Sequence, residues 1–282
     1  MTVFPFISSY FTSIIAYINN SAESVGPNVL SRTARKEHTH LRKDYDLMID
    51  QLVTWIKEQI TRADCQGAVV GLSGGIDSSV TAALCKKAFP ETTLGVIMPC
   101  ESQPQDGKDA QFLAEQLNID YKVILLDQTY QTLLKALHNS EAPTHKLAYA
   151  NIKPRLRMTT LYFYANLTNS LVVGTDNRSE LKIGYFTKYG DGGIDITPLG
   201  NLVKTEVQEL ARLLDIPQPI REKRPSAGLW LGQEDEVELG FGYQDLDYYI
   251  LNKSAEPAIK ERIDSLAKKN NHKLKLPPIP DF

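Results

Sequence analysis

The sequence predicts an α/β fold built on a doubly wound parallel sheet of about five strands, with helices on both faces. Short apolar runs of strand length alternate with longer segments in which apolar residues recur every three or four positions. The first apolar run also leads into a glycine-rich turn followed by a helical segment. Parallel strands joined by right-handed crossovers place their carboxyl ends at one edge of the sheet, where ligands bind in such folds.

Residues 1–43 differ in character from the rest of the chain. The apolar stretch Phe4 to Ile18 has no basic region before it, and its roughly 15 residues are too few to cross a bilayer. Residues 32–43 then carry mostly basic charge. We expect a flexible N-terminal extension over residues 1–43, for which organelle targeting remains open, and one domain over residues 44–282.

The elements of that domain follow from the spacing of apolar residues and from breakers such as Pro90. Expected strands cover residues 68–72, 93–98, 121–126 and 171–173. Expected helices cover residues 44–62, 80–89, 109–117, 128–137, a long segment from 151, 204–215, 243–252 and 258–268. Residues 217–240 lack periodicity, and we expect them to form a mobile lid.

Composition narrows the classes of function. The net charge of −3 and pI near 6.0 disfavour a nucleic-acid-binding protein that works through general basicity. The three cysteines have no metal-site spacing, which suggests a reducing compartment such as the cytoplasm. We expect no membrane partner.

The segment from Gly71 to Ser79 is the strongest candidate for a functional site. Its central glycines, Gly74 and Gly75, permit a tight turn between strand and helix. We expect the hydroxyls of the three serines in this segment to cap the first amides of the helix, which would leave a nest of N–H donors suited to phosphate.

Three charged residues near the predicted sheet edge extend this interpretation. Asp77 stands inside the turn, where a Walker-type loop would have a lysine, and it can act as a Mg²⁺ ligand or as a helix cap. Glu180 lies in the loop after the strand 171–173, so it can face Asp77 and share the ion, or cap a helix. Lys204 begins a predicted helix and is either a phosphate ligand or an exposed side chain.

Two further segments remain ambiguous from their residues alone. Asn151 to Met158 carries three cations, which most often form a solvated face. Gly184 to Asp195 is rich in glycine and aromatic residues, as a binding loop or a surface Ω-loop would be. A lone histidine such as His272 is usually solvated.

Together these segments resemble the ammonia-dependent NAD synthetases, a family of N-type ATP pyrophosphatases with an adenine nucleotide alpha hydrolase-like fold. The resemblance covers residue 44 to the end and rests on four separated signatures. They are Ser73 to Ser79, Asn151 to Met158, Gly174 to Asp195, and Lys204 to Glu206 with Pro225 to Ala227 downstream. In that family ATP adenylates the nicotinate carboxylate of deamido-NAD, and ammonia attacks the acyl adenylate to give NAD, AMP and pyrophosphate.

The resemblance implies roles for individual residues. Asp77, Glu180 and Lys204 would be catalytic, with Asp77 and Glu180 as the Mg²⁺ ligands. The residues implied for ATP are Gly71, Leu72, Ser73, Gly74, Gly75, Ile76, Asp77, Ser78, Thr175, Lys204 and Ser226. Those implied for deamido-NAD are Arg155, Lys188, Asp195, His272 and Lys273. The family forms homodimers with the dinucleotide site at the subunit boundary.

Three features depart from the family pattern. Pro154 replaces a small residue before Arg155, Gly228 stands where the family usually has Asp, and residues 1–43 have no counterpart. The chain also has no room for the amidase domain of glutamine-dependent relatives, so free ammonia or a separate donor protein would supply the nitrogen. Two other kinds of protein remain as alternatives: another pyrophosphatase-loop enzyme, either GMP-synthetase-like or tRNA-modifying, and a non-catalytic adenine-nucleotide-binding subunit.

Overall fold

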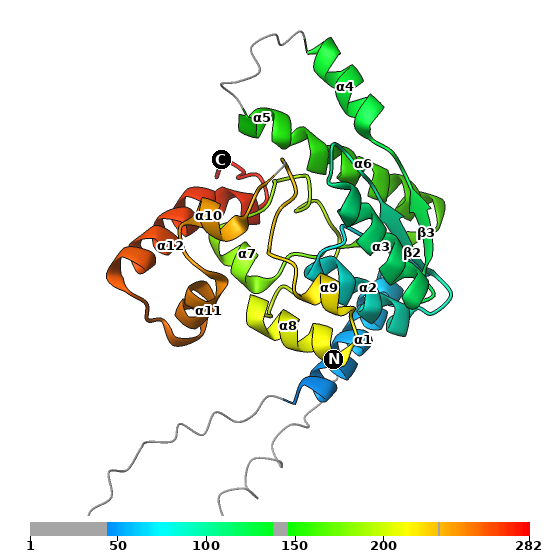
Figure 1. Cartoon of the computed structure of the whole chain (residues 1–282), viewed down its shortest axis with the longest axis horizontal. Coiled ribbons are helices and arrows are strands. Elements are labelled where there is room, and N and C mark those ends of the chain that lie inside the picture. The colour runs from blue at the N-terminus through cyan, green and yellow to red at the C-terminus, as the bar shows by residue number, and fades with distance from the viewer. Residues whose placement is uncertain (1–43, 138–145, 231) are drawn as a thin grey trace, which may run out of the picture. The chain divides into compact units, whose positions relative to one another are not determined.

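Four parallel strands form the central sheet in the computed structural model, which describes residues 44–137, 146–230 and 232–282 (Figure 1). The strands are β1 (Gly67–Gly71), β2 (Thr93–Ile97), β3 (Asp120–Val123) and β4 (Ser170–Val173). Their order is β3-β2-β1-β4. The chain therefore winds outward from β1 to β3 and then crosses to the other side of β1. This reversal confirms the doubly wound topology and places the switch point between β1 and β4.

The prediction of about five strands was too high by one among the described residues. Beside β4, where a fifth strand would pair, Ile196 makes a single parallel bridge with Val173. Pro198 follows two residues later and has no N–H with which to extend the ladder. The chain then turns away from the sheet.

Helices cover both faces of the sheet, as predicted. On one face, α1 (Tyr45–Arg62), α2 (Ile76–Ala88), α3 (Pro104–Gln116) and α8 (Lys204–Leu213) share a core with Ala68 and Val70 of β1. On the other face, α4 (Asp127–Ala136) and α6 (Ile152–Leu167) share a core with Val69. Because successive strand residues point to opposite sides, β1 contributes to both cores.

A third core lies beside the sheet layers. It joins α7 (Arg178–Ile183), α10 (Asp235–Leu239), α11 (Tyr243–Asn252) and α12 (Pro257–Asn270). Figure 1 shows these four helices grouped on the side away from β2 and β3. The remaining short helices are α5 (Lys146–Ala150), α9 (Gln218–Arg221) and the 3₁₀ helix η3 (Asn271–Leu274).

Several element boundaries differ from the predictions. Helix α2 begins at Ile76 rather than Val80, because the extended backbone of Gly75 lets the helix start directly after the turn. Helix α3 begins at Pro104 rather than Asp109, since proline suits the first helical position. The predicted lid contains α9 and α10, so two parts of it are helical despite their lack of periodicity. Among the described residues, no helix has the length and apolarity needed to cross a bilayer.

Candidate active site

The glycine-rich turn lies between the end of β1 and the start of α2, at the switch point of the sheet. Its three serines close the turn on itself, contrary to the expectation that they cap the helix. Ser78 Oγ and Ser79 Oγ donate to the Gly75 carbonyl at 3.0 and 2.7 Å, and Ser73 Oγ accepts from Gly75 N at 3.3 Å. Because α2 has no side-chain cap, the amides of its first turn are available to an anion.

The left-handed backbone of Gly74 fits this turn closely against α3. Its φ is +76°, a conformation that glycine adopts without strain. A Cβ at this position would come within 2.3 Å of the Asp106 carbonyl oxygen. Any larger residue at position 74 would therefore displace the glycine-rich turn from the first turn of α3.

Asp77 meets the loop after β4, as the sequence predicted for two loops at one sheet edge. Asp77 Oδ1 accepts a hydrogen bond from Asn177 Nδ2 at 2.9 Å, across 100 positions of sequence. Asn177 is itself fully buried and caps α7 through its Oδ1, which accepts from the amides of Ser179 and Glu180. The residue that caps α7 is therefore hydrogen-bonded directly to Asp77, which follows the glycine-rich turn.

Glu180 caps a helix, which is one of the two roles that the sequence left as alternatives, and its carboxylate also faces the ammonium of Lys204. Its Oε2 accepts from Asn177 N at 3.1 Å, which completes a capping box at the start of α7. Its Oε1 lies 3.5 Å from Lys204 Nζ and 3.5 Å from the Tyr243 hydroxyl. One carboxylate oxygen thus holds the helix, and the other faces the site.

Lys204 is the first residue of α8, and its side chain is almost completely buried. Its ammonium forms ion pairs with both Asp77 and Glu180. The backbone amide of Lys204 donates to Ser179 Oγ at 3.1 Å, so α7 also fixes the start of α8. Two carboxylates and one ammonium, from three separate elements, meet at a single point.

Burial and mutual proximity shift the pKa values of Glu180 and Lys204. Burial, and next the Asp77 carboxylate, raise the pKa of Glu180 to about 8. Burial lowers the pKa of Lys204, but Asp77 and Glu180 outweigh it and the net shift is upward. The ammonium therefore remains charged at neutral pH, beside a Glu180 carboxyl group that releases its proton less readily than an exposed one.

The donor set suits a magnesium ion that completes its shell from a ligand. Among the described residues, no three histidine, cysteine or carboxylate side chains are arranged to hold a metal ion. Asp77 and Glu180 nevertheless reach one cation together, the ammonium of Lys204. Since Mg²⁺ in nucleotide sites usually takes one or two carboxylates with phosphate oxygens and water, these two residues fit it.

A second cluster unites four of the five residues implied for deamido-NAD. Arg155 Nη2 donates to the Lys188 carbonyl at 3.3 Å, and Lys188 Nζ donates to the His272 carbonyl at 2.9 Å. Lys273 Nζ donates to the carbonyls of Gly184 and Phe186, both at 2.8 Å. The loop after α7 and the η3 segment therefore present basic side chains together with α6.

The remaining predicted residues have other surroundings. Asp195 accepts from the Tyr162 hydroxyl at 2.9 Å and from Val172 N at 2.8 Å, so it ties α6 to β4 rather than joining the basic cluster. Ser226 Oγ accepts from Gly228 N at 3.1 Å within the lid segment. Thr175 follows β4 by two positions, at the same edge as the phosphate loop. The binding roles of these residues stay predictions.

Two of the three departures from the family pattern are accommodated locally, and the third, the extension over residues 1–43, lies outside the described residues. Pro154 is the third residue of α6 and is buried, so the helix still begins normally with proline in its first turn. A Cβ on Gly190 would lie 2.9 Å from the Pro154 side chain, which shows that helix and loop pack closely there. Gly228 has φ of +61° and open space where a Cβ would lie.

Sequence reasoning missed several polar residues around the site. Asp176 is buried, its Oδ2 has no hydrogen-bond partner, and burial raises its pKa well above the usual carboxyl value. Asp235 and Tyr243 hydrogen-bond to each other at 3.1 Å beside Glu180. For Asn177, the spacing Asn-x-x-Glu before a helix was a signal that could have revealed it as the cap.

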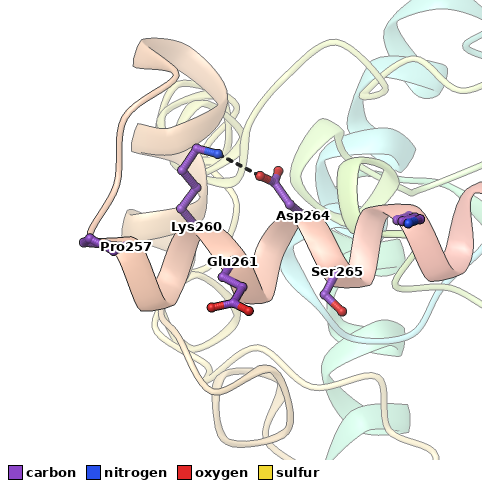
Figure 2. Close-up of a pocket in the computed structure, with 6 residues that line it drawn as sticks. Pro257, Lys260, Glu261, Asp264 and Ser265 are labelled. Atoms are coloured by element: carbon purple, nitrogen blue, oxygen red, sulfur yellow. Dashed lines mark hydrogen bonds and ion pairs between the residues drawn. The ribbon is translucent and has the colours of Figure 1, made fainter.

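A shallow depression elsewhere on the surface is not part of this site. Figure 2 shows that its lining comes from one side of α12. It is lined by Pro257, Lys260, Glu261, Asp264, Ser265 and Lys268. It contains none of the converging charges described above.

Comparisons with known proteins show which proteins this chain resembles in sequence and fold. The family model described as NAD synthase matches residues 48–277. The NH(3)-dependent NAD(+) synthetase of Carboxydothermus hydrogenoformans is 51% identical over 241 residues, covering 85% of this chain and 99% of the relative. A solved NMN synthetase from Francisella tularensis superposes with a TM-score of 0.80 at 41% identity, covering 84% of this chain and 98% of that one. An NH3-dependent NAD synthetase from Campylobacter jejuni has a TM-score of 0.71 at 31% identity, covering 85% and 100%.

Proposed function

Because this chain belongs to the NAD synthase family, we propose that it amidates deamido-NAD with ammonia at the expense of ATP. The products are NAD, AMP and pyrophosphate, and the intermediate is the acyl adenylate of the nicotinate carboxylate. The observation that carries this proposal is the meeting of Asp77, Glu180 and Lys204 beside an uncapped helix N-terminus at the sheet switch point. Such a point can hold a triphosphate and stabilise the pyrophosphate that leaves it.

Each part of the site has a defined task in this reaction. The first amides of α2 and the ammonium of Lys204 bind phosphate oxygens and stabilise the negative charge that builds on pyrophosphate. Asp77 and Glu180 would hold Mg²⁺, which would neutralise phosphate charge when bound. Ammonia itself attacks the activated carboxylate, so the protein needs no nucleophilic side chain.

The basic cluster is suited to the other substrate. Arg155, Lys188 and Lys273 carry positive charge next to each other, and deamido-NAD carries a pyrophosphate and a carboxylate. Their present bonds to backbone carbonyls keep the loop after α7 against η3. We assign this cluster to the dinucleotide.

The protein would act as a homodimer. Large apolar side chains are exposed on neighbouring elements: Phe163 and Leu167 of α6, Leu133 of α4, and Leu125 just after β3. Helix α4 contacts α6, and we expect a second copy of the chain to cover these side chains. A reducing, cytoplasmic compartment agrees with the three free cysteines.

The similarity to the Francisella structure favours a second candidate substrate. That protein is named as an NMN synthetase and is 41% identical to this chain. A nicotinate mononucleotide offers the same carboxylate for adenylation but lacks the adenylate half of deamido-NAD. The two reactions therefore share the ATP site and differ in how much of the second site they use.

Product analysis distinguishes these functions. The purified protein is incubated with ATP, MgCl₂ and ammonium, together with deamido-NAD, nicotinate mononucleotide or xanthosine monophosphate. We expect AMP formation with deamido-NAD at a kcat/KM at least about tenfold above that with the mononucleotide. A preference for the mononucleotide would transfer the assignment to NMN synthesis, and equal turnover of xanthosine monophosphate would remove both.

A further inference from the structure

Lys223 lies two residues after the end of α9, within the predicted lid of residues 217–240. Its side chain reaches two other parts of the chain, α3 and the glycine-rich turn. Its Nζ donates to Asp106 Oδ1 at 2.7 Å and to Asp109 Oδ2 at 2.6 Å, both in the first two turns of α3. It also donates to the Gly74 carbonyl of the phosphate loop at 3.3 Å. These partners lie more than 110 residues away in sequence.

The phosphate loop lies against the same turns of α3. The Gly74 backbone approaches the Asp106 carbonyl so closely that no side chain fits between the two segments. The carboxylates of Asp106 and Asp109 therefore stay close to the loop that is to receive the phosphates of ATP. Each carboxylate is partly exposed, at 27% and 12% of its side-chain surface.

The charges in this cluster would oppose ATP without the lysine. Two carboxylates next to a phosphate loop repel a triphosphate, and at the partly screened protein surface this repulsion is still substantial. Lys223 cancels one of the two charges and hydrogen-bonds to both. Its pKa is raised, since the two carboxylates outweigh the effect of burial, so it stays charged.

We propose that Lys223 is a positioning residue for ATP, which offsets one of the two negative charges of Asp106 and Asp109 and holds the Gly74 carbonyl in place so that the loop accepts the phosphates. This inference rests on the proposed use of ATP at the glycine-rich loop.

The test compares the KM values for ATP and deamido-NAD in the full chain. For Lys223→Met we expect the KM for ATP to rise about tenfold or more, while kcat and the KM for deamido-NAD change by less than about threefold. Lys223→Arg should recover most of the ATP affinity because it retains the charge. Lys260→Met, on the exposed side of α12, is the control and should match the wild-type protein.

A second experiment removes the charges of Lys223 and of both its carboxylate partners together. Replacing both partners, in the variant Lys223→Met with Asp106→Asn and Asp109→Asn, should bring the KM for ATP back to within about threefold of wild type. An unchanged KM for ATP in Lys223→Met would overturn the proposal, as would a triple variant that remains as impaired as the single one. If the wild-type protein forms no AMP, the proposed function fails instead, and circular dichroism identifies any variant that does not fold.

Discussion

The ammonium of Lys204 is paired with two carboxylates in the interior of the site. Removing this ammonium leaves both carboxylates without a cation. In Lys204→Met, Asp77 and Glu180 would lie side by side without a cation, and breaking a buried ion pair in this way typically costs about 3–5 kcal/mol. Protonation of Glu180, whose pKa is already raised, should reduce this cost. The fold should therefore survive the change.

We predict that Lys204→Met lowers kcat by at least about 100-fold, because pyrophosphate loses the cation that stabilises it. Urea unfolding checks that the variant is folded, and steady-state assays of AMP formation check the rate. Arg212→Met is the control, since Arg212 is exposed on the same helix. Turnover near the wild-type rate in Lys204→Met would mean that the phosphates bind elsewhere.

The raised pKa of Glu180 predicts how stability depends on pH. Its folded pKa of about 8 lies above the usual carboxyl value near 4.3, so between these values the folded protein holds a proton that the unfolded chain releases. The contribution of Glu180 is therefore fully favourable below about pH 4 and is lost as the pH rises through 8.

The measurement is the free energy of unfolding in urea between about pH 5 and pH 8 without added metal or nucleotide. The wild-type protein should lose a few kcal/mol more than Glu180→Gln over this range, because glutamine has no proton to release. Glu209→Gln, an exposed position on α8, should keep the wild-type slope. Parallel slopes for wild type and Glu180→Gln would contradict the shifted pKa.

At the scale of elements, α10 anchors the lid segment instead of leaving it loose. Asp235 accepts from Ala227 N at 2.9 Å and from the hydroxyls of Tyr185 and Tyr243 at 3.2 and 3.1 Å. Tyr243 in turn reaches Glu180 at 3.5 Å. A hydrogen-bonded path therefore runs from the lid to the charged group at the switch point.

Asp235→Ala should release this lid. Three donors would lose a buried acceptor, which we expect to destabilise the protein by about 2–4 kcal/mol and to open the segment 225–234 to proteolysis. Limited chymotrypsin digestion followed by mass spectrometry locates the cleavage, for which Leu229 and Trp230 are sites within the segment. Val237→Ala, at an exposed position of α10, should be cleaved no faster than wild type.

At the scale of the whole molecule, the exposed apolar side chains on α6 and α4 predict a dimer. Phe163 is 62% exposed and Leu167 is 68% exposed, although both are apolar and lie on one helix. Phe163→Asp places a charge on this surface, which should convert the dimer to monomers. Since the dinucleotide site is proposed to lie at the subunit boundary, the KM for deamido-NAD should rise as well.

Light scattering coupled to size exclusion measures this outcome. Leu251→Asp on α11 is the control, because Leu251 is 50% exposed and lies in the other group of helices. It should leave the mass unchanged. A wild-type protein that is monomeric at micromolar concentration, or a Phe163→Asp variant that remains dimeric, would contradict the proposed interface.

The sequence by itself determined the order of the main elements and the edge at which the site lies. Alternating apolar runs and helical stripes are local patterns, so they predicted the four strands and most of the long helices. Strand β1 ends at the glycine-rich turn and β4 ends before Glu180, and parallel topology then requires the two loops to meet. Asp77 and Glu180 were brought together by this rule before any contact was known.

The tertiary structure alone decided what each charge in the site faces. Glu180 caps α7 with one oxygen and faces Lys204 with the other, whereas spacing left helix capping and a metal ion shared with Asp77 as two alternatives. The fifth strand is absent from the described residues because Ile196 makes one bridge before Pro198, and Lys223 reaches α3 and Gly74 from more than 110 positions away. The physical reason is that hydrogen bonds and ion pairs depend on distances of a few ångströms between remote segments, whereas hydrophobic periodicity is set by neighbours along the chain.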